Sequence, residues 1–280
     1  MKKSHLPFLL SCFPILALAK PVPPQPEILR RFGNAQPTLP LPPFHDGHFK
    51  ILPNETIVFT GQENMVRQQQ SGELEARLAL AFAEEKPVFR YMAWEADTVY
   101  QQWRELNFGD WKNQLETAGA TTIIIQYGKM EALDGKKRLS EFIAAYHHLL
   151  DQFSAQTRRI VLLSPTPFEK PLAPLAPDLS GRNGDLAAYV TAIRDIAAQR
   201  KAIFIDLFTT APQKRLTEDG LHPTPVGLGT VARMIAEQIG NMFRVFRHRF
   251  KLDQDLPERD RTQFRRPRTD PDQLTLFDEL

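Results

Sequence analysis

The sequence predicts an α/β protein with a five-stranded parallel sheet that is covered by helices on both faces. Two observations predict this fold class. Five short apolar runs of strand length recur along the chain, and segments with helical spacing of apolar residues separate most of them. Parallel strands are buried on both faces and therefore read as continuous apolar runs. The chain of 280 residues is long enough for one medium domain with an ample core.

The expected elements follow one another from residue 56 onward. The first strand covers residues 56–60, and a helix is expected over 67–85, where Leu74 and Leu78 share one face. In parallel sheets of this kind, sites lie beyond the carboxyl ends of the strands, so the loops after the strands are where chemistry is expected. The other strands are expected at 88–92, 121–127, 159–163 and 202–206, and the other helices at 139–153, 185–200 and from Val226 onward.

The first 19 residues have the pattern of an export signal. Lys2 and Lys3 supply the basic start, residues 6–18 are apolar, and Ala17 and Ala19 give the small-x-small cleavage pattern. We expect Sec-dependent export to the periplasm or the cell exterior, with cleavage after Ala19. The single cysteine, Cys12, lies inside this segment, so the mature protein is expected to have no disulfide.

Three further segments follow the signal. Residues 20–45 are Pro-rich and are expected to form an extended, poorly ordered leader. Residues 46–243 form the expected folded domain, and 244–280 form a charged tail that is expected to extend the last helix and then become disordered. The basic residues of the tail could make a weak contact with an anionic membrane surface or an envelope polymer. The favoured interpretation is that these residues simply face solvent. The net charge of +2 gives no indication of a nucleic-acid partner, and nothing indicates an oligomeric state.

The loop after the fifth expected strand carries the clearest chemical signal. Asp219 stands three residues before His222 in a loop that also contains Gly220 and Pro223. A carboxylate at this spacing can orient an imidazole, and such a pair is the back half of a Ser-His-Asp triad. The alternative is that His222 fills a turn before the last helix.

Five loops together resemble those of the SGNH (GDSL-like) hydrolase superfamily, over residues 56–240. They contain Gly61-Gln62-Glu63, Ala93 with Trp94, Gly128-Lys129-Met130-Glu131, residues 162–167 after the fourth strand, and Asp219-x-x-His222. The resemblance implies a three-layer α/β/α, flavodoxin-like fold. It also implies an ester-hydrolase lineage that acts on acyl or acetylated-carbohydrate esters, with Asp219, His222 and the residue at position 63 as the catalytic positions.

The chain departs from the family pattern at the residues that do the chemistry. Glu63 occupies the place of the nucleophilic serine and has no hydroxyl. Ala93 replaces the second-loop glycine, and Met130 replaces an asparagine that donates to the oxyanion; a thioether cannot donate. Loss of one such donor costs about 10²–10³-fold in rate, and loss of the nucleophile removes the acyl-enzyme route. Gly128 and Glu131 are expected to complete the cleft.

These departures predict a catalytically impaired protein that binds a small molecule or glycan bearing ester or acyl groups. One alternative is an atypical esterase in which Glu63 and His222 activate water. Another is a scaffold or envelope protein whose leader and tail make the important contacts. Ser164, at the end of the fourth strand, offers a hydroxyl, but a turn residue before Pro165 is the favoured interpretation.

No cofactor or metal is expected. Glu63, Glu131, Asp219 and His222 could converge on a cation, but no two-histidine spacing supports such a site. The aromatic residues after the second strand are a separate group. We expect at least half of them in the core and the others along a sugar or acyl groove; they are Trp94, Trp103, Phe108 and Trp111.

Overall fold

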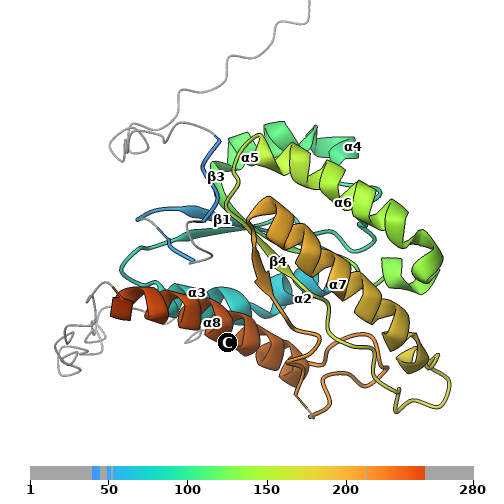
Figure 1. Ribbon diagram of the computed structural model, residues 1–280. Coiled ribbons are helices and arrows are strands. Elements are labelled where there is room, and N and C mark those ends of the chain that lie inside the picture. The colour runs from blue at the N-terminus through green and yellow to red at the C-terminus, as the bar shows by residue number, and fades with distance from the viewer. Residues whose placement is uncertain (1–39, 45–48, 52, 213, 250–280) are drawn as a thin grey trace, which may run out of the picture. The chain divides into compact units, whose positions relative to one another are not determined.

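Five parallel strands form one sheet in the order β2-β1-β3-β4-β5 (Figure 1). This order is the flavodoxin-like one, in which the direction of winding reverses next to β1. The predicted fold class is therefore confirmed. The strands are β1 (Thr56–Gly61), β2 (Val88–Tyr91), β3 (Ala120–Gln126), β4 (Ile160–Leu163) and β5 (Ile203–Ile205).

The computed structural model describes residues 40–44, 49–51, 53–212 and 214–249, with the side chains of 107 and 243–249 left out. All of these residues belong to one compact unit. The expected signal segment, most of the expected leader and residues 250–280 of the expected tail lie outside the described residues. In the described part, no helix is both long and apolar enough to cross a bilayer.

Helices cover both faces of the sheet (Figure 1). On one face, α5, α6 and α7 pack through Trp111, Phe142 and Ile193. On the other face, α2, α3 and α8 pack through Met65 and Leu78, among other residues. The helices are α2 (Glu63–Ser71), α3 (Glu73–Ala81), α4 (Glu105–Phe108), α5 (Trp111–Ala118), α6 (Leu139–Ser154), α7 (Asn183–Arg200) and α8 (Pro225–Arg249).

The single helix expected over 67–85 is in fact two helices. Gly72 adopts φ +67 between α2 and α3, and its N–H bonds to the carbonyl of Gln68. This is the left-handed helix end for which glycine is preferred. The first of the two helices, α2, also begins four residues earlier than expected, at Glu63, two residues after the end of β1.

The start of the domain also differs from the expected boundary at residue 46. Leu41 and Phe44 lie in the expected leader, yet both are buried. The carbonyl of Leu41 accepts a hydrogen bond from the N–H of Arg158. Residues 40–44 therefore pack against the domain rather than forming an unattached leader.

Candidate functional site

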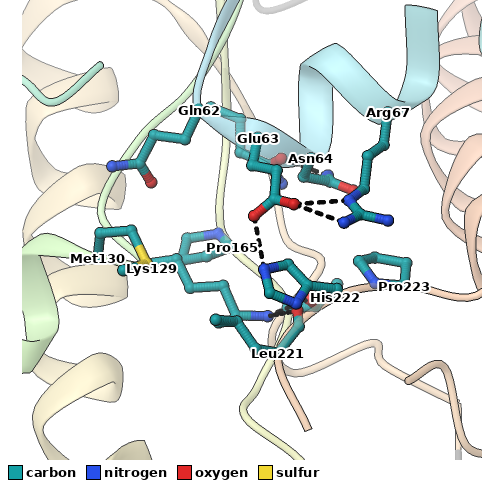
Figure 2. A pocket seen from close by; sticks show the side chains of 12 residues that line it. Gln62, Glu63, Asn64, Arg67, Lys129, Met130, Pro165, Leu221, His222 and Pro223 are labelled. Atoms are coloured by element: carbon teal, nitrogen blue, oxygen red, sulfur yellow. Dashed lines mark hydrogen bonds and ion pairs between the residues drawn. The ribbon is translucent and has the colours of Figure 1, made fainter. Parts of the chain in front are cut away.

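A pocket lies at the carboxyl ends of β1, β3 and β4, next to the point where the winding reverses. Its cavity volume is about 40 Å³, and one enclosed water needs roughly 10–15 Å³, so the pocket holds a few waters or a group of similar size. The side chains come from the start of α2 and from the loops that follow β3, β4 and β5. They are Gln62, Glu63, Asn64, Arg67, Gln126, Lys129, Met130, Pro165, Thr166, Leu221, His222 and Pro223 (Figure 2).

Glu63 enters this pocket as the first residue of α2. The preceding Gly61 has φ +144, and a Cβ at that position would lie 2.4 Å from the carbonyl oxygen of Gln126. Only glycine therefore allows the chain to leave β1 so close to β3. One turn further on, Arg67 approaches Oε1 of Glu63 with Nε and Nη2, each at 2.7 Å. The N-terminal turn of α2 also favours a negative charge at Glu63.

His222 contacts a carboxylate through each of its ring nitrogens. Nε2 lies 2.7 Å from Oε2 of Glu63 (Figure 2), and Nδ1 contacts Oδ2 of Asp219. If both carboxylates are ionised, the ring can donate to both only when both nitrogens carry a proton. Such an imidazolium has no lone pair with which to accept another proton. Arg67, Glu63, His222 and Asp219 then form a chain of alternating charges.

Asp219 is held by the backbone of its own loop. Its Oδ1 accepts hydrogen bonds from the N–H groups of Leu221 at 3.0 Å and His222 at 2.8 Å. Partial burial acts to raise the pKa of this carboxyl, but those two bonds and the interaction with the imidazole outweigh it and lower the pKa to about 2. Asp219 is therefore ionised at neutral pH and orients the ring of His222.

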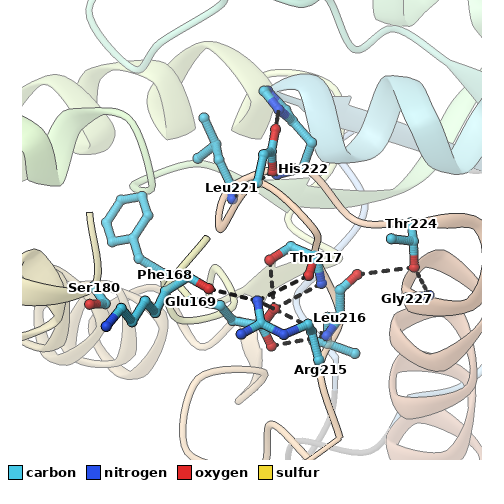
Figure 3. A network of polar contacts seen from close by, with 12 residues as sticks. Phe168, Glu169, Ser180, Arg215, Leu216, Thr217, Leu221, His222, Thr224 and Gly227 are labelled. Atoms are coloured by element: carbon cyan, nitrogen blue, oxygen red, sulfur yellow. Dashed lines mark hydrogen bonds and ion pairs between the residues drawn. The ribbon is translucent and has the colours of Figure 1, made fainter. Parts of the chain in front are cut away.

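A second carboxylate fixes the other side of this loop (Figure 3). Glu169 accepts hydrogen bonds from the N–H of Leu216 at 2.9 Å, the N–H of Thr217 at 2.8 Å and the hydroxyl of Thr217 at 2.5 Å. Gly220 has φ +86, and a Cβ there would lie 2.2 Å from the carbonyl oxygen of Glu169. The loop that presents His222 is thus anchored on both sides before any ligand arrives.

The expected cleft residues Gly128 and Glu131 have a different role. Glu131 is buried, and it accepts hydrogen bonds from the N–H groups of Val99 and Gly128 and from Nε2 of Gln62, each at 2.9 Å. Burial raises the pKa of Glu131, although these bonds oppose the shift. Neither Gly128 nor Glu131 lines the pocket. Glu131 instead ties together the loops after β1, β2 and β3.

Of the other two expected oxyanion positions, Met130 and Ala93, only Met130 lies in the pocket. Met130 lines the pocket and is 43% exposed. Ala93 does not line it, and packs against the core on the α2, α3 and α8 face. Ala93 therefore lies outside the pocket, and the N–H of the next residue, Trp94, bonds the carbonyl of Gly61 at 3.3 Å.

The four residues once considered as metal ligands do not meet at one point. Glu63, His222 and Asp219 form a line, whereas Glu131 is held apart by its own three donors. Over the described residues, no group of three or more His, Cys, Asp or Glu side chains is arranged to hold a metal ion.

Ser164 has a structural role. Its side chain is fully buried, and its Oγ accepts hydrogen bonds from the N–H groups of Leu207 and Phe208 at 2.7 Å and 3.0 Å. It therefore fixes the end of β4 to the segment after β5. The expected turn role, in which Ser164 bonds its own backbone, was wrong, because the backbone that its hydroxyl contacts is that of the segment after β5.

The expectation that at least half of the aromatic group lies in the core was wrong. Only Trp111 of the four is buried, with its ring edge-on to Phe153. Trp94, Trp103 and Phe108 are each at least 40% exposed, and none of them lines the pocket. They lie on α4 and the irregular chain before it, which has too few neighbours to cover them.

Two charged pocket residues, Arg67 and Lys129, were given no role in the sequence analysis, and four further lining residues were not named there: Asn64, Gln126, Thr166 and Leu221. Arg67 could have been found from its spacing, because residues four apart on a helix are neighbours and Glu63 precedes it by four. Lys129 follows β3 directly, and its Nζ donates to Oγ1 of Thr166 and to the carbonyl of Leu221, both at 3.2 Å. Burial lowers the pKa of Lys129 to about 8, although nearby carboxylates oppose this shift.

The loop after β2 contains a buried carboxyl group, that of Asp97, and it makes the stability of the fold depend on pH. Asp97 is buried, and its Oδ2 has no hydrogen-bond partner among the described residues. Burial raises the pKa of Asp97 to about 6, against the N–H of Trp103 and the charge of Arg104. The folded state then holds a proton that the unfolded state releases, so the free energy of unfolding should fall by about 2–3 kcal/mol as the pH rises from about 4 through about 6.

Urea unfolding of the wild type and Asp97→Asn between about pH 4 and pH 7 would check this. The variant should lack that part of the decline and should gain relative stability toward neutral pH. Equal pH slopes for the two proteins would contradict the assignment to Asp97.

No protein-family model matches the chain, and no curated protein matches its sequence. Among solved structures, a GDSL-like lipase candidate from Parabacteroides merdae has 16% identity over 70% of this chain and 99% of its own, with a TM-score of 0.56. The acetylxylan esterase Axe2 from Geobacillus stearothermophilus has 17% identity over 69% and 97%, with a TM-score of 0.52. The acetyl xylan esterase AlAXEase has 13% identity over 66% and 99%, with a TM-score of 0.51. The chain thus has the fold of these SGNH and GDSL-like esterases.

Proposed function

We propose that this chain, built on the fold of the SGNH and GDSL-like hydrolases, is a catalytically impaired member of that ester-hydrolase lineage that binds a ligand in the cleft. The ligand class is a small molecule or glycan that bears ester or acyl groups. Residues 1–19 support an exported protein, because they combine a basic start, an apolar run and a small-x-small site. Acetylated carbohydrate is the first ligand to test, since two structural neighbours are acetylxylan esterases.

One observation carries the proposal of impaired catalysis. The imidazole nitrogen that would take the proton of a serine nucleophile is already in contact with Glu63, at 2.7 Å. Glu63 in turn is held by Arg67. The base nitrogen is therefore already in contact with a carboxylate, and the group at the nucleophile's position carries no hydroxyl. Met130 adds no donor for an oxyanion.

A second candidate, water activation by Glu63 and His222, rests on the same contact. General-base work needs a heavy-atom distance of about 2.6–3.2 Å or one bridging water, and the pocket has room for a few waters. This mechanism needs Glu63 or an unprotonated His222 ring to accept the proton of the reacting water, and later to return it to the leaving group. It therefore predicts turnover that depends on both Glu63 and His222.

Hydrolysis and binding should be measured on the same purified protein. With an aryl acetate and an acetylated xylose as substrates, we expect the wild type to differ by less than about twofold from His222→Ala, since no acyl-enzyme can form. His148→Ala, at an exposed position on α6, is the matched control. Calorimetry should show saturable binding of the acetylated sugar.

Each outcome separates the candidates. Turnover that disappears in His222→Ala and Glu63→Gln, but persists in the control, would establish the second candidate instead. Absence of both turnover and binding for acetylated sugars would rule out this ligand class for the cleft.

A further inference from the structure

The ammonium group of Lys129 lies in the pocket but has no role in the function proposed above. Lys129 reaches from the end of β3 toward Leu221, beside the imidazole of His222 (Figure 2). Its Nζ donates to two neutral oxygens, the hydroxyl of Thr166 and the carbonyl of Leu221, both at 3.2 Å. An ammonium has three N–H donors, so one N–H has no oxygen partner after these two bonds; Nζ also lies 5.3 Å from the ring centre of Phe168.

The other charged side chains of the pocket are already compensated. Arg67 pairs with Glu63, and His222 lies between Glu63 and Asp219. Among the described residues, by contrast, no carboxylate forms an ion pair with Nζ of Lys129. A charge that is partly removed from water without a counter-ion costs free energy. The pocket therefore holds one positive charge that an anionic ligand group would neutralise.

The surroundings keep this charge in place near neutral pH. Burial lowers the pKa of Lys129 to about 8. The carboxylates that face it act in the opposite direction: Glu169 in the loop after β4, Asp219 in the loop before α8, and Glu63 on α2. The Lys129 side chain is thus mainly cationic at about pH 7. It loses its charge as the pH rises above about 8, at mildly alkaline pH values that most folded proteins tolerate.

We propose that Lys129 binds a carboxylate group of the ligand, so that the cleft selects anionic ligands over neutral ones of the same shape. This inference rests on the proposed ligand-binding function and adds the charge of the ligand to it. A carboxylate fits better than a phosphate, because the cavity is about 40 Å³ and a phosphate has more acceptor oxygens than one ammonium can satisfy. Met130, the neighbouring side chain, has no donor to add.

Acetate and acetamide test the proposal on the unmodified protein, since they have the same shape and differ in charge. Calorimetric titration at about pH 7 and constant ionic strength should give a Kd for acetate that is about tenfold or more below that for acetamide, the size expected for one charge-assisted hydrogen bond. The acetate affinity should also fall several-fold by about pH 9.5, as the ammonium loses its proton.

Variants then assign the effect to one side chain. Lys129→Met keeps the length of the side chain and should raise the Kd for acetate by about tenfold or more. Lys137→Met, at an exposed position outside the pocket, should leave it unchanged. Melting curves of both variants show whether they are folded, and the comparison of acetate with acetamide does not depend on either.

Equal affinities for acetate and acetamide, or an unchanged acetate affinity in folded Lys129→Met, would overturn the proposal. These failures differ from a failure of the proposed function. A neutral acetylated sugar that binds while acetate does not would leave the ligand-binding function standing and remove only the role of Lys129.

Discussion

The double substitution Glu63→Ser with Met130→Asn is expected to give the chain an esterase activity that the wild type lacks. It returns a hydroxyl to the start of α2 and a side-chain donor to the loop after β3. The donor alone is worth about 10²–10³-fold in such sites, and the hydroxyl opens the acyl-enzyme route. We therefore expect the double variant to exceed Glu63→Ser by about 10²-fold in kcat/KM for an aryl acetate, and to show a burst that marks the acyl-enzyme and that Met130→Asn lacks.

The geometry limits how much of this activity the serine substitution can give alone. Nε2 of His222 now lies 2.7 Å from the end of the glutamate side chain. A serine hydroxyl ends two bonds nearer the backbone, on the order of 2 Å shorter. The anchored histidine loop must therefore move, or one water must bridge the gap, before the ring can take the proton. This gap is the same in both variants, and Glu63→Ser alone should be weaker still because Met130 gives it no oxyanion donor.

Adding His222→Ala to the double variant is the control for this experiment. The gain should then disappear, because the hydroxyl has no base. A gain that survives the loss of His222 would show that the activity comes from somewhere other than the rebuilt triad. A folded double variant with no esterase activity would show that the cleft lacks further catalytic groups besides the hydroxyl and the oxyanion donor.

The strands could be predicted because a strand that is buried on both faces needs apolar residues at nearly every position, and the sequence shows this as a continuous apolar run. The helix boundaries were harder to predict. The break at Gly72 depends on one left-handed residue inside an otherwise helical pattern. Helix α5 was missed, although Asp110 caps its start, with its side chain accepting from the N–H of Asn113, and Gly119 ends it. Those two residues were the available signal.

The sequence predicted which loops form the site, but it did not predict which side chains of those loops line the pocket. Parallel strands place the loops after β1 and β5 at the same carboxyl edge, and this, with the family resemblance, is why Glu63 and His222 were expected together. Which side chains of those loops face the pocket depends on local backbone geometry. Glu131 is near the edge yet turns inward, because three donors converge on it. Lys129 was passed over because its surroundings are formed by Thr166 and Leu221, from two other loops.

Removing either partner of the Glu55–Arg159 pair is expected to destabilise the fold by about 3–5 kcal/mol. Both side chains are less than a tenth exposed, and they form an ion pair. The guanidinium of Arg159 also bonds the carbonyl of Lys50 and lies 4.8 Å from the ring centre of Phe44. One pair therefore joins β1, the start of β4 and the segment before the sheet. Either truncation leaves the other charge buried without its counter-ion.

Urea unfolding of Glu55→Ala and Arg159→Met would measure this loss. The double variant Glu55→Leu with Arg159→Met should lose less than the sum of the two, because an apolar pair removes both buried charges together. Glu237→Ala is the control, since its pair with Arg233 is about half exposed, and surface pairs contribute about 0–1 kcal/mol. Single variants within about 1 kcal/mol of the wild type would show that the pair is dispensable. Additive losses in the double variant would show that each side chain acts through its own packing and not through the other's charge.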